Sequence, residues 1–384
     1  MPLKVARRAA VPPFIAMEVL RAANERAAAG EKVLHLEIGQ PDTGAPAAVL
    51  EAAARALKTH RLGYTEAMGI PPLRAAIAAH YRERYRIGID PARVAVTTGS
   101  SGAFMLAFLA AFEAGDRVAL AAPGYPAYRN ILLALELEPV DLPAGPDTHF
   151  QPTPELLERA GGRIDGLIVA SPSNPTGSML DRAALAALVE YCRARGIRLI
   201  SDEIYHGIVY AGEAASAAAL DETAVVVNSF SKYFSMTGWR LGWMIVPPDL
   251  ARAVECLAQN LFISPPTLPQ LAAEAVFGCR EELDAHVARY RRNRDLLLAE
   301  LPKAGLAHFA PPDGAFYLYT DIGHLTNDSE DLCRRLLAEA GVAATPGVDF
   351  DRSRGHRYLR LSYAGSTAAM AEAAERLIAW RRRG

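Results

Sequence analysis

Short runs of apolar and β-branched residues alternate with longer segments of helical periodicity along most of the chain. Several runs lack a two-residue alternation, which is typical of strands that are buried on both faces. The pattern predicts strands at residues 94–97, 117–121, 166–170, 198–201, 224–228 and 241–246. Because strands separated by helices at this spacing are joined by right-handed crossovers, we expect a mostly parallel sheet.

One of the helices between these strands is well marked, at residues 181–195. Its apolar residues share one face. Asp181 is a favourable N-cap, and Gly196 is a favourable stop at the other end. This α/β alternation is therefore predicted from local signals alone.

The pattern changes towards the C-terminus and predicts a smaller α+β domain. A long helix is expected at 268–301, followed by strands at 314–321, 341–345 and 358–363 and helices at 329–340 and 367–381. An isolated helix at 13–30 is expected to pack against this small domain or a partner subunit. The predicted domains are 1–45 (an N-terminal helix and a segment joining the small domain), 46–282 (large) and 283–384 (small).

Composition narrows the function classes. The chain has 384 residues, which is too long for one simple core, with 51% hydrophobic and 22% charged residues and a net charge of -2. Since no long basic run is present, no nucleic-acid partner is expected. No apolar run is long enough for a membrane span, and the N-terminus lacks the layout of a signal peptide.

The four cysteines are scattered without a CxxC spacing, and the nine histidines do not cluster. Neither a disulfide framework nor a metal site is therefore expected. Reduced thiols fit a cytoplasmic protein.

Polar and turn residues follow five of the predicted strands. These segments are TGSS at 98–101, PGY at 123–125, SPSNPTG at 171–177, DEIY at 202–205 and SFSK at 229–232. Ligands of open α/β sheets bind at the carboxyl ends of strands, so we expect the five segments to converge on one crevice.

Part of this set is suited to a phosphate. Residues 99–101 begin a predicted helix, and small residues there present backbone N–H groups and hydroxyls to an anion. A helix-capping serine would give the same local sequence. Ser229, Ser231 and Arg240 are further candidates, and Arg240 adds a permanent charge in fork geometry.

Asp202 and Lys232 each follow a buried strand. A buried carboxylate is costly unless it is paired, so Asp202 is either the partner of a protonated ring nitrogen or a turn residue. Lys232 taken alone would be a solvated lysine. The combination of its amine with this carboxylate, a phosphate cradle and an aromatic partner, Tyr125, favours a ligand site.

Residues 229–242, SFSKYFSMTGWRLG, resemble the cofactor-lysine motif of the class I and II aminotransferases, which are pyridoxal 5′-phosphate (PLP) enzymes of fold type I. LEIGQPD at 36–42, GYT at 63–65, NPTG at 174–177, DEIY at 202–205 and RLSY at 360–363 match further motifs of that family in order and spacing. The resemblance covers nearly the whole chain. It implies a large domain with a mostly parallel, seven-stranded sheet between helices, and a small α+β domain.

The resemblance also implies catalytic roles for Lys232, Asp202 and Tyr205. Lys232 forms a Schiff base with PLP and, once the substrate amine releases it, moves the proton from Cα to C4′. Asp202 keeps the pyridine nitrogen protonated, so that the ring acts as an electron sink. Asn174 and Tyr205 hydrogen-bond the 3′-oxygen, and Tyr125 stacks on the ring.

The remaining implied roles concern the phosphate and the substrate. The phosphate is held by Ser100, Ser101, Ser229, Ser231 and Arg240. Tyr64 reaches it from the other subunit of a homodimer. Arg360 binds the substrate α-carboxylate as a bidentate pair, helped by Asn174 and the Gly39 backbone.

The implied reaction moves the amino group of an L-amino acid to a 2-oxo acid such as 2-oxoglutarate or pyruvate. Family members that act on dicarboxylates often have a lysine where this chain has Ser101. We therefore expect a neutral donor, aliphatic or aromatic. Phe14, Ile15 and Phe104 are candidates for an apolar side-chain pocket, although ordinary core packing would account for them equally well.

Two alternatives remain open at this stage. A PLP-dependent carbon–sulfur β-lyase, or a decarboxylase or synthase of the same fold, needs the same Lys232 and Asp202. A non-catalytic PLP-sensing module of a transcription regulator is expected to carry an added DNA-binding domain. We expect no such segment before Pro13 or after Trp380.

Overall fold

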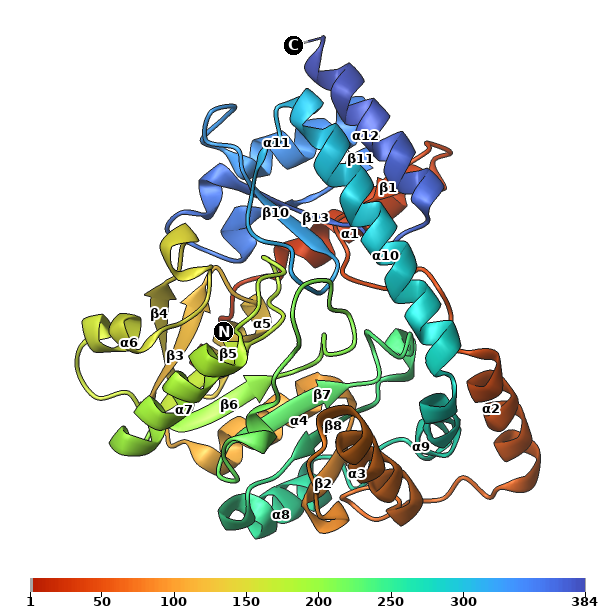
Figure 1. The fold of residues 1–384 in the computed structure, drawn as a ribbon, viewed down its shortest axis with the longest axis vertical. Coiled ribbons are helices and arrows are strands. Elements are labelled where there is room, and N and C mark those ends of the chain that lie inside the picture. The colour runs from red at the N-terminus through yellow and green to blue at the C-terminus, as the bar shows by residue number, and fades with distance from the viewer. Residues whose placement is uncertain (1–2, 384) are drawn as a thin grey trace.

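A seven-stranded sheet forms the larger part of the molecule, of which a computed structural model describes residues 3–383 (Figure 1). The strand order is β2-β8-β7-β6-β5-β3-β4. The strands are β2 (Val94–Thr97), β3 (Arg117–Ala122), β4 (Glu138–Pro143), β5 (Gly166–Ala170), β6 (Arg198–Asp202), β7 (Val225–Ser229) and β8 (Gly242–Ile245). Only β8 runs antiparallel to its neighbours, so the predicted mostly parallel, seven-stranded sheet is confirmed.

Both faces of this sheet are buried. Leu167 and Val169 of β5 belong to one apolar cluster, and Ile168 between them belongs to another. Helices α4 (Gly99–Ala111), α5 (Pro126–Ala134) and α8 (Ala251–Leu261) pack in the cluster around Ile168. The other face is covered by α3 (Pro71–Tyr85), α6 (Pro154–Ala160), α7 (Arg182–Arg195) and α9 (Thr267–Ala273).

The edge strand β4 is not predicted by the apolar pattern. It pairs only with β3 and contains Pro139 and Pro143, which remove two backbone donors from the ladder. Proline is tolerated at a sheet edge, where one side of the strand needs no partner. The well-marked helix is confirmed, because α7 begins after its N-cap Asp181 and ends at Gly196.

A second, four-stranded sheet lies towards the C-terminus, in the order β12-β13-β10-β9. Its strands are β9 (His308–Phe309), β10 (Tyr317–Asp321), β12 (Thr345–Pro346) and β13 (Tyr358–Ser362). A short parallel pair, β1 (Leu34–His35) with β11 (Val342–Ala343), ties the early chain to this part. The helices here are α10 (Arg280–Glu300), α11 (Ser329–Arg335) and α12 (Thr367–Arg381).

The prediction of a single helix at 268–301 is wrong. Helix α9 ends at Ala273, a 3-10 segment spans Glu274–Gly278, and α10 begins at Arg280. Gly278 lies at the break, and glycine is a poor helix former. Figure 1 shows α10 running along one side of the molecule, from α9 near the large sheet to the C-terminal sheet.

Helix α1 (Ile15–Ala28) packs on the C-terminal part, as one of the two alternatives predicted. Its Ala23 lies in an apolar cluster with Leu337 and Ala343. No side chain next to it in sequence caps its N-terminus. Instead Asp349 accepts hydrogen bonds from the backbone N–H groups of Ile15 (3.0 Å) and Ala16 (3.1 Å).

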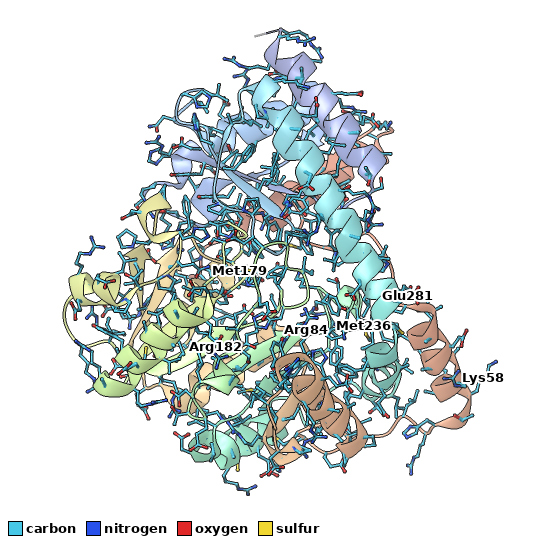
Figure 2. All side chains as sticks on the ribbon, viewed as in Figure 1. Lys58, Arg84, Met179, Arg182, Met236 and Glu281 are labelled. Atoms are coloured by element: carbon cyan, nitrogen blue, oxygen red, sulfur yellow. The ribbon has the colours of Figure 1, made fainter. Side chains whose placement is uncertain are left out.

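Helix α2 (Ala47–Thr59) stands at the outer edge of the molecule, where Lys58 points away from the rest of the chain (Figure 2). Within residues 3–383, no helix combines the length and the apolar character that crossing a membrane requires. The domain boundaries at 45/46 and 282/283 stay a prediction.

Candidate active site

A cavity of about 390 Å³ lies at the carboxyl ends of the parallel strands. All five strand-end segments contribute to its wall, and β10 and β13 contribute Tyr317 and Arg360. The predicted site residues that line it are Gly39, Ser100, Ser101, Tyr125, Asn174, Asp202, Tyr205, Ser231, Lys232, Arg240 and Arg360. The five segments that the sequence singled out therefore meet at one crevice in the structure.

Asp202 ends β6 and is 2% exposed. Its Oδ1 accepts a hydrogen bond from Ile204 N at 3.1 Å, and its Oδ2 accepts one from Tyr128 Oη. Burial outweighs these hydrogen bonds and raises the pKa of the carboxyl to about 6. Among residues 3–383 no basic side chain forms an ion pair with it, so a cationic ligand group would relieve the cost of burying its charge.

Lys232 presents its amine to the same cavity. Its Nζ donates to the carbonyl of Gly39 at 2.7 Å. Burial and, to a smaller extent, the charges of Arg360 and Arg240 lower the pKa of this amine to about 8, against the opposing effect of Asp202. An amine with such a pKa is unprotonated more often than an ordinary lysine, which favours attack on a carbonyl.

The start of α4 and the side chain of Arg240 form the anion-binding end of the cavity. Thr98, the N-cap, makes no side-chain cap hydrogen bond, so its hydroxyl leaves the N–H groups of the first helical turn uncapped. Gly99 has φ +71°, and a Cβ there would lie 2.6 Å from Arg240 Nη2. Helix N–H groups beside a guanidinium and the hydroxyls of Ser100 and Ser101 suit a phosphate.

The two serines of the lysine motif occupy different depths. Ser231 lines the cavity, whereas Ser229 is 1% exposed and lies behind it. The Ser229 hydroxyl bonds Ser231 Oγ at 2.9 Å and accepts from Ser231 N at 3.1 Å. Through these two hydrogen bonds Ser229 holds Ser231 in place. Thr237, which the sequence analysis did not select, lines the cavity beside Arg240.

Arg360 is 2% exposed on β13. Its Nη1 donates to Asn174 Oδ1 at 2.9 Å, and its Nη2 donates to Thr345 Oγ1 at 3.1 Å and to the carbonyl of Glu37. Its Nε is buried without a hydrogen-bond partner. A buried permanent cation without a carboxylate partner among the described residues is suited to an anionic ligand.

Two tyrosines of the wall, Tyr128 and Tyr317, are not among the predicted site residues. Tyr317 Oη and Tyr205 Oη lie 2.6 Å apart. A Cβ at Gly39 would lie 1.8 Å from Tyr317 Oη, so this close approach of the backbone requires glycine. Tyr128 holds Asp202 and packs edge-on against Tyr125, with ring centroids 5.2 Å apart. Its one signal was a position three residues after Tyr125, within the first turn of α5.

Part of the cavity wall is apolar. Helix α1 contributes Ala16, Met17 and Leu20, and Phe14 and Phe104 lie beside them. The expected contribution of Ile15 is absent from this wall, because residues 16, 17 and 20 share a helix face that 15 does not. Tyr64 is 84% exposed and does not reach the cavity of its own chain.

This donor set fits PLP. The uncapped helix start and Arg240 match its phosphate, buried Asp202 matches a protonated pyridine nitrogen, and Lys232 supplies the amine for a Schiff base. Within residues 3–383, no three or more His, Cys, Asp or Glu side chains gather in a way that would hold a metal ion.

Comparison with known proteins gives the same assignment. The family model for aminotransferase class I and II matches residues 31–377. A relative named valine–pyruvate aminotransferase, from Mycobacterium tuberculosis, is 51% identical over 381 residues, 98% of each chain. An aspartate/prephenate aminotransferase from Thermus thermophilus is 36% identical over 373 residues, 96% of each chain.

Solved structures agree in fold. A crystal structure of an aminotransferase from Mycobacterium tuberculosis has a TM-score of 0.98 at 50% identity and covers 100% of both chains. Thermus thermophilus aspartate aminotransferase with maleate has a TM-score of 0.92 at 34% identity, over 98% of this chain and 100% of that chain. The chain therefore belongs to the class I and II aminotransferases and is a PLP-dependent enzyme.

Proposed function

We propose that this enzyme transfers the amino group of a neutral L-amino acid, aliphatic in preference to aromatic, to pyruvate or 2-oxoglutarate. The observation that carries the proposal is the lining of the cavity, which combines buried Arg360 with the apolar residues of α1. Ser101 offers no charge to a second carboxylate. The name of the Mycobacterium tuberculosis relative, valine–pyruvate aminotransferase, agrees with this choice.

Arg360 and Asn174 bind the substrate α-carboxylate in this proposal. The free Nε of Arg360 and its Nη atoms offer donors in fork geometry, and the hydrogen bond to Asn174 fixes the guanidinium plane. The same pair then binds the carboxylate of the 2-oxo acid in the second half of the reaction. Holding one carboxylate in both halves keeps Cα near Lys232, so proximity contributes to the rate.

Lys232 carries the proton between Cα and C4′. PLP supplies the electron sink when bound, and Asp202 keeps its pyridine nitrogen protonated. A base with a pKa near 8 is well matched to proton transfer near neutral pH. Tyr128 orients Asp202. Tyr205 and Asn174 would hydrogen-bond the 3′-oxygen of the cofactor, and Tyr125 would stack on its ring.

The phosphate is held in this proposal by Ser100, Ser101, Ser231 and Arg240, with Ser229 supporting Ser231.

We also propose a cytoplasmic location for this enzyme. The four free cysteines of the chain are consistent with it, because thiols stay reduced in the cytoplasm.

A donor screen with purified holoenzyme tests the substrate proposal. With pyruvate or 2-oxoglutarate as acceptor, kcat/KM for valine is expected to exceed that for aspartate at least about tenfold, because the second carboxylate would be buried without a partner. Conversion of the cofactor to pyridoxamine phosphate by the donor alone is expected. Ammonia released without a 2-oxo acid would instead indicate the β-lyase.

Ser101→Lys is the matched variant for this screen. It places an ammonium on the cavity wall in the first turn of α4, and is expected to raise kcat/KM for aspartate relative to valine. A wild-type preference for aspartate would contradict the proposal of a neutral donor.

We also propose a homodimer in which Tyr64 of one subunit reaches the cofactor phosphate of the other. Tyr64 is 84% exposed, and Leu50 and Leu57 of the outlying helix α2 are 52% and 60% exposed. Ile263 is another exposed apolar residue, at 53%. A subunit interface at this part of the molecule would remove these apolar side chains from water.

Mixing two inactive variants tests this arrangement. In a hybrid of Tyr64→Ala and Lys232→Ala subunits, one of the two sites is intact if Tyr64 acts across the interface. Refolding the two chains together is expected to restore roughly a quarter of the wild-type activity, because half of the dimers are hybrids with one good site. No restoration would place Tyr64 in the site of its own chain.

A further inference from the structure

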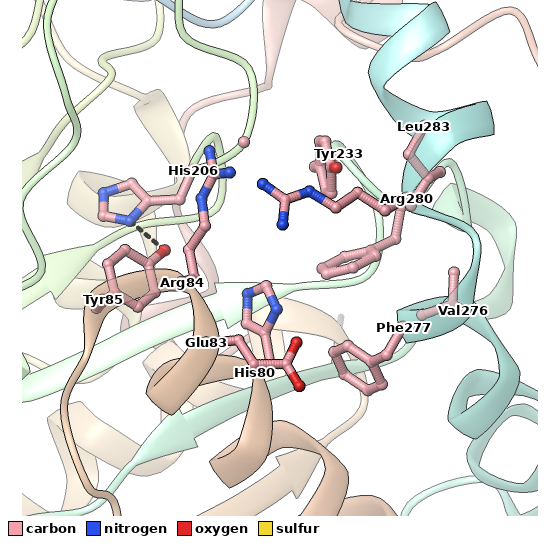
Figure 3. A pocket seen from close by; sticks show the side chains of 12 residues that line it. His80, Glu83, Arg84, Tyr85, His206, Tyr233, Val276, Phe277, Arg280 and Leu283 are labelled. Atoms are coloured by element: carbon pink, nitrogen blue, oxygen red, sulfur yellow. Dashed lines mark hydrogen bonds between the residues drawn. The ribbon is translucent and has the colours of Figure 1, made fainter.

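A second group of buried polar side chains lies outside the cofactor cavity, directly after Asp202. Glu203 is 1% exposed and His206 is 6% exposed. Helix α3 contributes Tyr85, and Tyr85 and His206 line a small hollow of about 40 Å³ (Figure 3). No residue of this group lines the cofactor cavity, so the proposed reaction leaves their function open.

The hydrogen bonds of His206 determine which nitrogen carries the proton. Its Nε2 lies 3.0 Å from the carbonyl oxygen of Ser171, which can only accept, so Nε2 donates. Its Nδ1 lies 2.8 Å from Tyr85 Oη, as the dashed line in Figure 3 marks. Burial lowers the pKa of the imidazole to about 3, so it is neutral and Nδ1 accepts.

Glu203 has one satisfied and one unsatisfied oxygen. Its Oε1 accepts from Ala217 N at 2.8 Å and from the hydroxyls of Ser216 at 3.1 Å and Ser201 at 3.2 Å. Its Oε2 is buried without a hydrogen-bond partner and lies 3.5 Å from His206 Nδ1. Burial raises the pKa of this carboxyl to about 8, so at neutral pH it carries a proton, and Oε2 is the oxygen free to hold it.

The surrounding charges agree with a neutral pair. Asp202 is the adjoining carboxylate, and its charge disfavours a second one at Glu203. The titratable and charged groups around the pair are His80, Tyr81, Glu83, Arg84 and Tyr85 on α3, Arg280 at the start of α10, and Tyr233. Of these, Arg84 disfavours a positive charge on His206, and His80 is itself neutral because burial lowers its pKa to about 4.

Ser171 begins the turn that carries Asn174. Its backbone N–H donates to the carbonyl of Asp202 at 3.3 Å, and its own carbonyl accepts from His206. Ser171, at the start of the turn, is therefore held by the last residue of β6 and by His206 in the segment that follows this strand. Three residues later, Asn174 Oδ1 accepts from Arg360 at 2.9 Å.

We propose that His206 is a positioning residue for the substrate carboxylate site. Its neutral imidazole, kept in the Nε2–H form by Tyr85 and by a protonated Glu203, holds Ser171 and thereby sets Asn174 against Arg360. This inference rests on the proposed role of Arg360. It adds that two buried groups, the carboxylic acid of Glu203 and the imidazole of His206, position the carboxylate site without touching the substrate.

The first test compares two variants of His206 in the holoenzyme. Glutamine keeps an N–H that reaches the Ser171 carbonyl, whereas phenylalanine keeps the ring volume and has no polar atom. His206→Phe is expected to raise KM for the amino donor about tenfold or more, the effect of one buried hydrogen bond, and His206→Gln to recover most of it. Affinity for PLP is expected to change less than about twofold, since the phosphate contacts lie elsewhere.

A role in packing alone predicts the opposite order, with phenylalanine the better replacement. Equal KM values in the two variants would also overturn the inference. Because His206→Phe leaves Glu203 and Tyr85 without a partner, a measurement on the unmodified protein is needed as well.

That measurement is NMR of the holoenzyme labelled with ¹⁵N-histidine. His206 is expected to carry one proton, on Nε2, and not to titrate between about pH 6 and 9. Glu203→Gln, whose amide reproduces the protonated acid, is expected to keep this signal and to change kcat/KM less than about twofold. Two protonated nitrogens in the wild type would show an imidazolium paired with ionised Glu203 and would overturn the inference.

The NMR result does not depend on the identity of the amino donor. A failed donor screen would therefore reject the proposed substrate and leave the His206 tautomer standing, whereas a titrating His206 would reject this inference alone.

Discussion

Lys232→Ala is expected to abolish amino transfer, lowering kcat by about four orders of magnitude or more. The variant lacks the amine that is proposed both to bind the cofactor and to carry the proton. Nζ has a single hydrogen bond, to Gly39, so its removal leaves little unsatisfied in the protein. The visible absorption band of the lysine-bound cofactor is expected to disappear, and single-turnover kinetics measure the remaining rate.

Lys232→Arg is the matched control. Arginine keeps the positive charge near Asp202 but is a poor nucleophile, so it is expected to be as inactive as alanine. An activity well above that of Lys232→Ala would mean that charge, and not the amine, is the contribution of this residue. An unchanged absorption band in Lys232→Ala would contradict the assignment of the cofactor lysine.

Asp202→Asn is expected to lower kcat by about three orders of magnitude with the fold intact, because the amide no longer keeps the pyridine nitrogen protonated. Asparagine has the same size and still accepts from Ile204 N. Circular dichroism checks the fold, and stopped-flow absorbance measures the rate of proton transfer. A kcat within about tenfold of wild type would show that the carboxylate charge is not needed.

The same substitution is expected to raise the stability of the cofactor-free protein at neutral pH, although it lowers kcat. The folded pKa of Asp202, about 6, lies above its ordinary value of 3.8, so the folded protein binds this proton more tightly than the unfolded chain. The contribution of Asp202 to stability therefore falls as the pH rises from about 4 to about 6 and is constant above that. Two pH units correspond to roughly 3 kcal/mol.

Cofactor-free Asp202→Asn is accordingly expected to unfold at a higher temperature than the cofactor-free wild type at pH 7, and at the same temperature near pH 4. With PLP bound the order is expected to reverse, because the cationic ring stabilises the wild-type carboxylate. Thermal melts of both proteins, with and without PLP, distinguish these cases.

Much of the site follows from local sequence signals. Asp202 and Lys232 come directly after buried strands, and apolar runs of this kind are recognisable in isolation. Gly99 could be placed because a helix start has a sequence signature. Arg360 had no such signal and was identified only through the resemblance of residues 360–363 to a family motif.

What the sequence could not predict depends on packing between distant segments. Tyr128 contacts Asp202 because α5 lies against the end of β6, and 74 positions separate the two residues. Tyr317 meets Tyr205 across the cavity, over 112 positions. The break after α9 and the edge strand β4 were missed for a different reason, since in both the local pattern contradicts the structure that forms.

The cap on α1 has a consequence for the order in which the protein is made. The backbone N–H of Ile15 donates its hydrogen bond to Asp349, a residue 334 positions later, and α1 forms part of the substrate wall. During synthesis the first helix therefore leaves the ribosome long before its cap exists, and the wall is completed only when nearly the whole chain has been translated. A nascent or truncated chain that folds the large sheet alone would lack this wall, so substrate selectivity is the last property that the growing protein acquires.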